Sequence, residues 1–126
     1  MNHGLFDLQV NGFAGVDFQR PEITHADLER AAEALRRHQT TGILFTLITD
    51  TIDALAEQLE RVERIRAESP SVREMIAGYH IEGPYLLPEL GYHGAHDPRK
   101  MKAPDRAEFD RLQRSAGGRI RLRIVN

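Results

Sequence analysis

The residues with the clearest potential for chemistry stand where an apolar segment ends in the sequence HIEGP. If that segment is a strand, its two-residue side-chain period places His80 and Glu82 on the same face. Gly83 and Pro84 then end the pairing, because glycine tolerates positive φ and proline lacks an N–H. Glu82 is left at the carboxyl end of a strand, where α/β folds bind ligands and metals. The alternative is a carboxylate that only accepts hydrogen bonds from loop amides.

A second polar group belongs to the first predicted strand. Residues 5–10 alternate between apolar and polar side chains, which predicts a strand with one polar face. That face carries Asp7, Gln9 and Asn11, and the glycine-rich sequence NGFAG follows. Glycines there allow a tight turn or a close approach of the backbone. The pattern indicates a binding site at the exit of the strand, and the alternative is an edge strand with a solvated face.

Composition limits the classes of function. The chain has 126 residues, of which 40% are hydrophobic, as expected for one soluble globular unit with a core. The net charge is −2 without a basic block, so nucleic-acid binding is not indicated. Because cysteine is absent, any metal would need histidine, carboxylate or amide ligands. No apolar run approaches the ~20 residues of a membrane span, and the cytoplasm is the expected location.

Helical and strand patterns alternate along the chain. A helix is expected to begin at a Thr24–Asp27 capping pair and to leave through Gly42. Residues 83–104 form a loop of about twenty residues, which is longer than compact domains keep without a functional reason. The order strand, helix, strand, helix, strand, loop, helix, strand predicts a parallel sheet. The predicted fold class is α/β, either an open doubly wound sheet or the first part of a (β/α)8 barrel. The strands are expected at 5–10, 43–49, 75–81 and 120–124, and the later helices at 50–69 and 105–117.

Four motifs, in order, resemble those of N-acetylglucosamine-6-phosphate deacetylases, a branch of the amidohydrolase superfamily. They are DLQVNG at 7–12, TLIT at 46–49, HIEGPYL at 80–86 and GAHDP at 94–98. Most amidohydrolases place His-x-His on the first strand, whereas Gln9-x-Asn11 is similar to the deacetylase branch. The resemblance implies a TIM barrel that binds one or two divalent metals, usually zinc. It also implies hydrolysis of the acetamide of a phosphorylated amino sugar.

The resemblance implies a metal side of the site. Glu82 resembles the metal-ligating carboxylate, and Gln9 and Asn11 resemble the first-strand residues near the metal. His80 is expected to be a core residue or to support a ligand from behind rather than to bind metal itself. A metal would lower the pKa of a bound water toward ~7 and polarise a carbonyl, which suits amide hydrolysis.

The resemblance also implies a substrate side. His96 resembles the loop histidine that meets the amide carbonyl of the substrate, with Gly94 and Ala95 in the same substrate-binding motif. A histidine donor there would stabilise the developing oxyanion. His93 receives no role, since an exposed loop histidine is the simpler interpretation.

A complete TIM barrel takes ~250 residues, so residues 1–126 are expected to form one domain, the first half of such a barrel. The metal-binding histidines and the catalytic aspartate of the family come from later strands, so no catalytic residue is assigned here. The small β-sandwich domain that usually precedes the first strand is also not expected. The chain by itself is expected to be inactive, with a second copy or the other half of the barrel as its partner. The alternative is a non-catalytic α/β binding or interaction module derived from the same fold.

Overall fold

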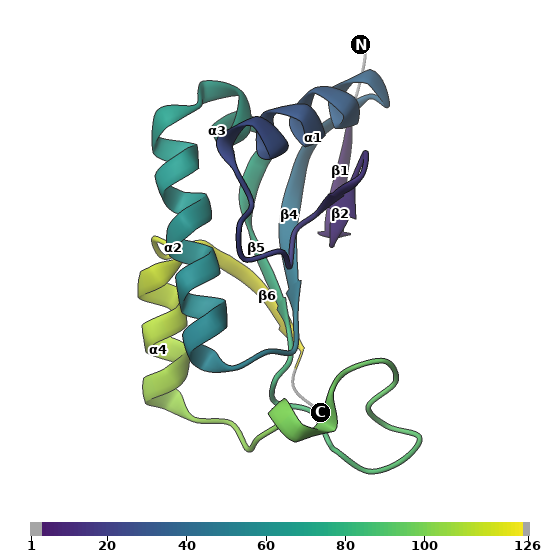
Figure 1. Cartoon of the computed structure of the whole chain (residues 1–126), viewed down its shortest axis with the longest axis vertical. Helices are drawn as coiled ribbons and strands as arrows, with labels where there is room; N and C mark the ends of the chain where they lie inside the picture. The colour runs from purple at the N-terminus through teal and green to yellow at the C-terminus, as the bar shows by residue number, and fades with distance from the viewer. Residues whose placement is uncertain (1–3, 125–126) are drawn as a thin grey trace.

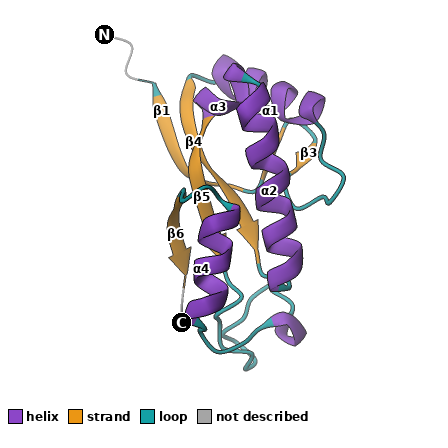
Figure 2. Cartoon of the chain, turned by 90° about the vertical axis from the view of Figure 1, so that its left-hand side faces the viewer, coloured by secondary structure: helices purple, strands orange, loops and turns teal. Residues whose placement is uncertain are grey.

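Residues 4–124 are described by the computed structural model, with the backbone alone described for 122–124. Four strands form one parallel sheet in the order β1–β4–β5–β6. The helices lie together on one face of this sheet (Figures 1 and 2). The strands are β1 (Leu5–Val10), β4 (Thr40–Ile48), β5 (Ile76–Glu82) and β6 (Ile120–Ile124). The helices are α1 (His25–Arg37), α2 (Ile52–Glu68), α3 (Pro70–Met75) and α4 (Arg106–Ser115).

The predicted α/β class and the parallel sheet are confirmed. Each strand pairs with the next strand of the sheet in sequence order, and a helical connection separates each pair. Within residues 4–124 the sheet stays open rather than closing on itself. No helix of this described part is long and apolar enough to cross a membrane.

The core lies between the sheet and the helices. Phe45 and Leu47 of β4 and Tyr79 and Ile81 of β5 are completely buried there. The ring of Phe45 stacks on that of Phe18, with centroids 4.3 Å apart. Burial raises the pKa of Tyr79, and its hydroxyl donates to Glu63 Oε1 on α2 at 2.6 Å. Because side chains alternate along a strand, packing these residues on the helices turns their neighbours to the opposite face.

Two local features differ from the sequence-based expectation, and the tight turn expected at NGFAG takes a specific form. The predicted exit of the first helix through Gly42 is wrong: Gln39 takes the positive φ of 64°, and Gly42 lies inside β4. The ring of Phe6 occupies the space beside Gly42, since a Cβ there would lie 2.7 Å from Phe6 Cε2. The NGFAG turn is a hairpin of β2 (Gly12–Phe13) and β3 (Val16–Asp17). The short helix α3 was not predicted, although Ser69 caps it and Pro70 opens it.

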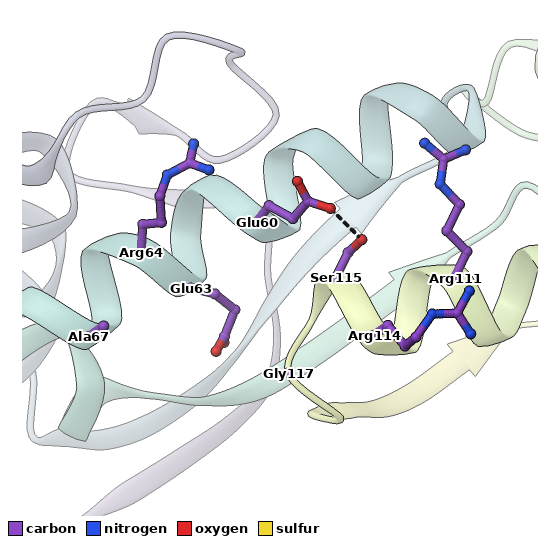
Figure 3. A pocket seen from close by; sticks show the side chains of 8 residues that line it. All are labelled: Glu60, Glu63, Arg64, Ala67, Arg111, Arg114, Ser115 and Gly117. Carbon is purple, nitrogen blue, oxygen red and sulfur yellow. Dashed lines mark hydrogen bonds between the residues drawn. The ribbon is translucent and has the colours of Figure 1, made fainter.

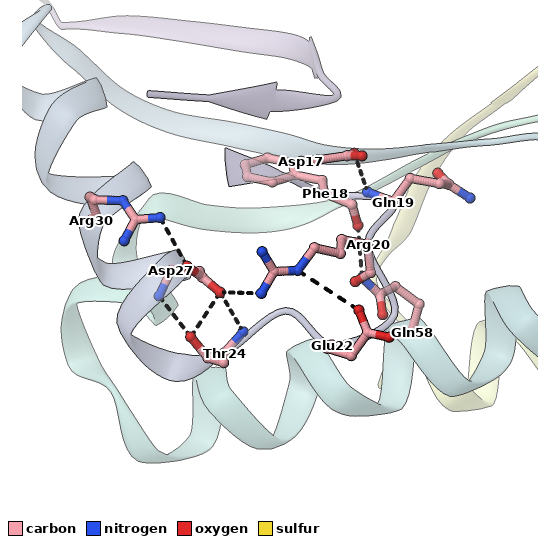
Figure 4. A network of polar contacts seen from close by, with 9 residues as sticks. All are labelled: Asp17, Phe18, Gln19, Arg20, Glu22, Thr24, Asp27, Arg30 and Gln58. Atoms are coloured by element: carbon pink, nitrogen blue, oxygen red, sulfur yellow. Dashed lines mark hydrogen bonds and ion pairs between the residues drawn. The ribbon is translucent and has the colours of Figure 1, made fainter. Parts of the chain in front are cut away.

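The segment from β3 to α1 is fixed by polar contacts (Figure 4). The side-chain amide of Gln58 on α2 donates to the carbonyl oxygens of Phe18, at 2.7 Å, and Arg20, at 2.9 Å. Thr24 and Asp27 form the predicted reciprocal capping box of α1. These contacts hold Phe18 against the sheet, where it completes the stack with Phe45.

Phe45→Ala is expected to lower the free energy of unfolding by about 3–5 kcal/mol, because it empties the centre of the aromatic cluster. Phe6→Ala is the matched control, since it makes the same change on the neighbouring strand where the side chain is 52% exposed. Urea unfolding followed by circular dichroism measures both values. Equal losses for the two variants would contradict this placement of the core.

Candidate functional site

The polar residues predicted from the sequence meet where β5 ends. The Gln9 side-chain amide on β1 donates to Glu82 Oε2 at 3.0 Å. On the other side of the carboxylate, His96 Nε2 lies 3.5 Å from Glu82 Oε1. The side chains of Glu82 and His96 are only 21% and 16% exposed. Gln9, which lies 73 residues before Glu82, and His96, from the loop after it, therefore share one carboxylate.

Thr49, just beyond β4, connects the histidine to the strand end. Its hydroxyl oxygen lies 2.8 Å from His96 Nδ1 and 3.3 Å from the carbonyl oxygen of Glu82, to which it donates. The Thr49 hydroxyl is thus hydrogen-bonded to His96 Nδ1, and His96 Nε2 faces the Glu82 carboxylate. Thr49 belongs to the TLIT motif but received no role from the sequence, where a polar residue ending an apolar run was the available signal.

The first strand is less regular than its alternating pattern predicted. Its pairing with β4 is interrupted between Asp7 and Val10. The backbone N–H of Gln9 donates to Asp7 Oδ1 at 2.9 Å. Asn11 makes no described side-chain contact with Glu82, and its carbonyl oxygen accepts from the Phe18 N–H at 3.0 Å. Of the three residues expected on one polar face, the structure brings Gln9 to Glu82.

His80 lies behind this site on β5, two residues before Glu82. It is 4% exposed, and its Nδ1 is 3.1 Å from the carbonyl oxygen of Leu8 on β1. Its Nε2 is buried and has no hydrogen-bond partner among the described residues. The predicted shared face of His80 and Glu82 agrees with Tyr79 and Ile81 packing toward the helices.

The loop at 83–104 carries the remaining predicted residues. Gly94 and Ala95 are exposed and directly precede His96. His93 Nδ1 lies 3.1 Å from the carbonyl oxygen of Gly94, which keeps this histidine in its own turn. Asp97 caps the short 3-10 helix η1 (Pro98–Lys100). Hydrogen bonds from Arg99 lower the pKa of the Asp97 carboxyl to about 2, so it stays ionised beside His96 at neutral pH.

The far end of the same loop is tied to the helix layer. Lys100 Nζ donates to Asp50 Oδ1 at 2.6 Å, close to the start of α2. Burial raises the pKa of Asp50, but the Lys100 contact and the Thr51 N–H outweigh it and leave the pKa below its ordinary value. Lys102 pairs with Glu108 on α4, and its N–H donates to the Pro84 carbonyl oxygen at 3.1 Å. The long loop is therefore anchored to the helix layer after His96, and its two ends are joined by the Lys102–Pro84 hydrogen bond.

The carboxylate of Glu82 fits one position of a metal site. Its described contacts are the Gln9 amide and the His96 ring, and no lysine or arginine in the described part of the chain pairs with it. Its negative charge is therefore available to a cation. No group of three His, Cys, Asp or Glu residues within 4–124 is arranged to hold a metal ion. The described residues thus offer one carboxylate ligand and not a complete set.

A separate hollow of about 590 Å³ lies between α2 and α4 (Figure 3). Glu60 on α2 accepts a hydrogen bond from the Ser115 hydroxyl on α4 at 2.8 Å across it. The side chains of Arg64, Arg111 and Arg114 diverge from one another in the close view, so they do not converge on one ligand position. None of the residues predicted for chemistry lines this hollow, which lies in the packing between the two helices.

Comparisons with known proteins agree with this geometry. No model of a known protein family matches the sequence. The N-acetylglucosamine-6-phosphate deacetylase of Bos taurus is 28% identical over 123 residues, which is 97% of this chain and 29% of that relative. The Homo sapiens enzyme of the same name is 27% identical over the same shares. The chain therefore spans less than a third of the length of the curated relatives that it matches.

Solved structures give the same result for the fold. N-acetyl-D-glucosamine-6-phosphate deacetylase from Mycobacterium smegmatis superposes with a TM-score of 0.80 and 29% identity, over 97% of this chain and 32% of that one. The Pasteurella multocida enzyme gives 0.78 and 25% identity, over 97% of this chain and 30% of that one. The chain is thus similar to part of a TIM-barrel hydrolase. The resemblance to N-acetylglucosamine-6-phosphate deacetylases, first seen in four motifs, is confirmed.

Gly83→Ala is expected to disrupt the site, whereas Gly91→Ala is expected to be mild. Both glycines have positive φ, at 99° and 92°, but a Cβ at Gly83 would lie 2.0 Å from Thr49 Oγ1 and one at Gly91 would meet nothing within 4 Å. Gly91→Ala should cost about 1–2 kcal/mol for its backbone alone. Gly83→Ala should cost more and should also separate Thr49 from His96.

Urea unfolding and NMR of the His96 ring test this pair of variants. The expected result is a changed His96 ring signal in Gly83→Ala and an unchanged one in Gly91→Ala. The same His96 ring signal in both variants would show that a side chain at position 83 does not displace Thr49.

Proposed function

We propose that this chain contributes the first four barrel strands, with the helices between them, of a metal-dependent hydrolase that removes the acetyl group from N-acetylglucosamine 6-phosphate. The observation that carries the proposal is the meeting of Gln9, Glu82 and His96 at the carboxyl end of β5. Parallel β/α folds place their active sites at this end. A mutant of the Mycobacterium smegmatis relative was crystallised with N-acetyl-D-glucosamine-6-phosphate, which supports a phosphorylated amino sugar as the substrate class.

Glu82 is the proposed metal ligand. The metal, with zinc as the expected ion, would supply a water of lowered pKa and polarise the acetamide carbonyl. Gln9 keeps the carboxylate oriented by donating to one oxygen, and as a neutral amide it does not cancel the negative charge. Asn11, which directly follows β1, is proposed to lie near the metal and to shape the entrance beside that strand. The other ligands are proposed to come from parts of the enzyme beyond the 126 residues.

His96 is the proposed contact to the acetamide carbonyl of the substrate. Thr49 holds Nδ1, so the ring is oriented before any substrate binds. The Thr49 hydroxyl has one proton, and when it donates that proton to Nδ1 instead of to the Glu82 carbonyl oxygen, Nε2 carries the ring proton. Nε2 is then a donor held in position, which stabilises developing charge without reorganising during the reaction. Gly94 and Ala95 are proposed to line the same side, where their small size leaves room for a sugar. Orientation of His96 by Thr49 is the part of the mechanism that this chain supplies directly.

The proposal is tested by supplying the rest of the enzyme. Co-expression with the remaining segment of the Mycobacterium smegmatis relative should yield acetate release from N-acetylglucosamine 6-phosphate. Glu82→Gln should reduce that rate by at least about a hundredfold, because a neutral amide cannot replace a carboxylate ligand. Glu89→Gln is the matched control, since it makes the same change on an exposed loop residue. A complemented enzyme that keeps its rate in Glu82→Gln would refute the assignment.

The 126-residue chain alone is expected to release no acetate. Metal-activated water needs about three protein ligands and an open position, and the described residues provide one carboxylate. The measurement is acetate release with added zinc, compared with a metal-free control. Activity that disappears in Glu82→Gln would overturn this expectation. Zinc-independent binding of a partner, together with no activity in the complemented enzyme, would instead favour a non-catalytic module.

A further inference from the structure

The irregular stretch of β1 from Leu8 to Val10 is held by side chains from two other strands. The Val10 N–H donates to Thr46 Oγ1 on β4 at 3.0 Å. The Leu8 carbonyl oxygen accepts from His80 Nδ1 on β5 at 3.1 Å. Both contacts flank Gln9, the residue whose amide meets Glu82. The interrupted pairing between Asp7 and Val10 explains why these backbone groups bond to side chains here.

His80 makes this contact across an intervening strand. The sheet order places β4 between β1 and β5, and His80 stands opposite Thr46 in the pairing of β4 with β5. The two side chains that hold Leu8 and Val10 are therefore neighbours on one face. The histidine side chain is long enough to reach past Thr46 to β1. Because the Leu8 carbonyl oxygen can only accept a hydrogen bond, His80 Nδ1 carries the proton.

We propose that His80 is a positioning residue, which fixes the β1 irregularity so that the Gln9 amide meets Glu82. This inference rests on the proposed function for its purpose, but the positioning itself is a property of the fold. Since Nδ1 donates to Leu8, Nε2 carries the ring's lone pair. A side chain that only filled space in the core would not need to donate to the Leu8 carbonyl oxygen. An apolar residue of similar size would fill that space equally well.

Two variants separate positioning from filling. His80→Asn keeps a donor close to the place of Nδ1, while His80→Phe keeps the ring and removes the donor. Hydrogen exchange measured by mass spectrometry follows the segment 5–12, with the segment 43–48 of β4 as internal reference. Loss of one buried hydrogen bond should speed exchange in 5–12 by about tenfold in His80→Phe, and His80→Asn should stay within about threefold of the parent.

Two NMR signals complete the test. The Gln9 side-chain amide signals should shift in His80→Phe and stay in place in His80→Asn. Nitrogen NMR of the His80 ring should show the proton on Nδ1. A proton on Nε2, or an unshifted Gln9 signal in His80→Phe, would overturn the proposal. Equal acceleration of both exchange segments in both variants would also overturn it, because His80 would then be a core residue only.

These measurements do not involve catalysis, so the two proposals fail separately. If the complemented enzyme releases no acetate while His80→Phe still loosens 5–12, the proposed function fails and the positioning role stands. If acetate is released and segment 5–12 is unaffected by His80→Phe, the function stands and the positioning role fails.

Discussion

The alternation of side chains along β5 is the constraint on which the rest of the structure depends. Tyr79 and Ile81 are fully buried against the helices, which forces His80 and Glu82 to the opposite face. A shift of one residue in this strand would exchange the two sets and bury a carboxylate in an apolar core. The stability of the fold and the position of the candidate site therefore follow from the same packing.

The site is built by bringing polar groups to that carboxylate from three directions. Gln9 comes from β1, Thr49 from the end of β4, and His96 from the long loop. Two of them have further support: His80 and Thr46 hold the β1 segment of Gln9, and Lys100 and Lys102 anchor the loop of His96. Groups that act on a bound molecule need such support, because loosely held groups lose much of their effect.

The open sheet and the incomplete ligand set agree with each other. The chain matches deacetylases over 97% of its own length but 29% of theirs. Within the described residues, Glu82 is not part of a group of three or more His, Cys, Asp or Glu side chains that could hold a metal. The charge of this carboxylate, which no lysine or arginine in the described residues neutralises, is the feature that the proposed metal role uses. The hollow between α2 and α4 lies in the helix layer, and none of the residues of this site lines it.

The sequence by itself determined the strand and helix order, the parallel sheet, and the shared face of His80 and Glu82, because these follow from local periods of two and 3.6 residues. The motifs also pointed to Gln9 and His96. Only the tertiary structure showed that Thr49 holds His96 and that His80 reaches Leu8 across β4. These contacts depend on an interrupted strand pairing and on the path of a long loop. Neither leaves a periodic signal, since each is set by packing between residues far apart in the chain.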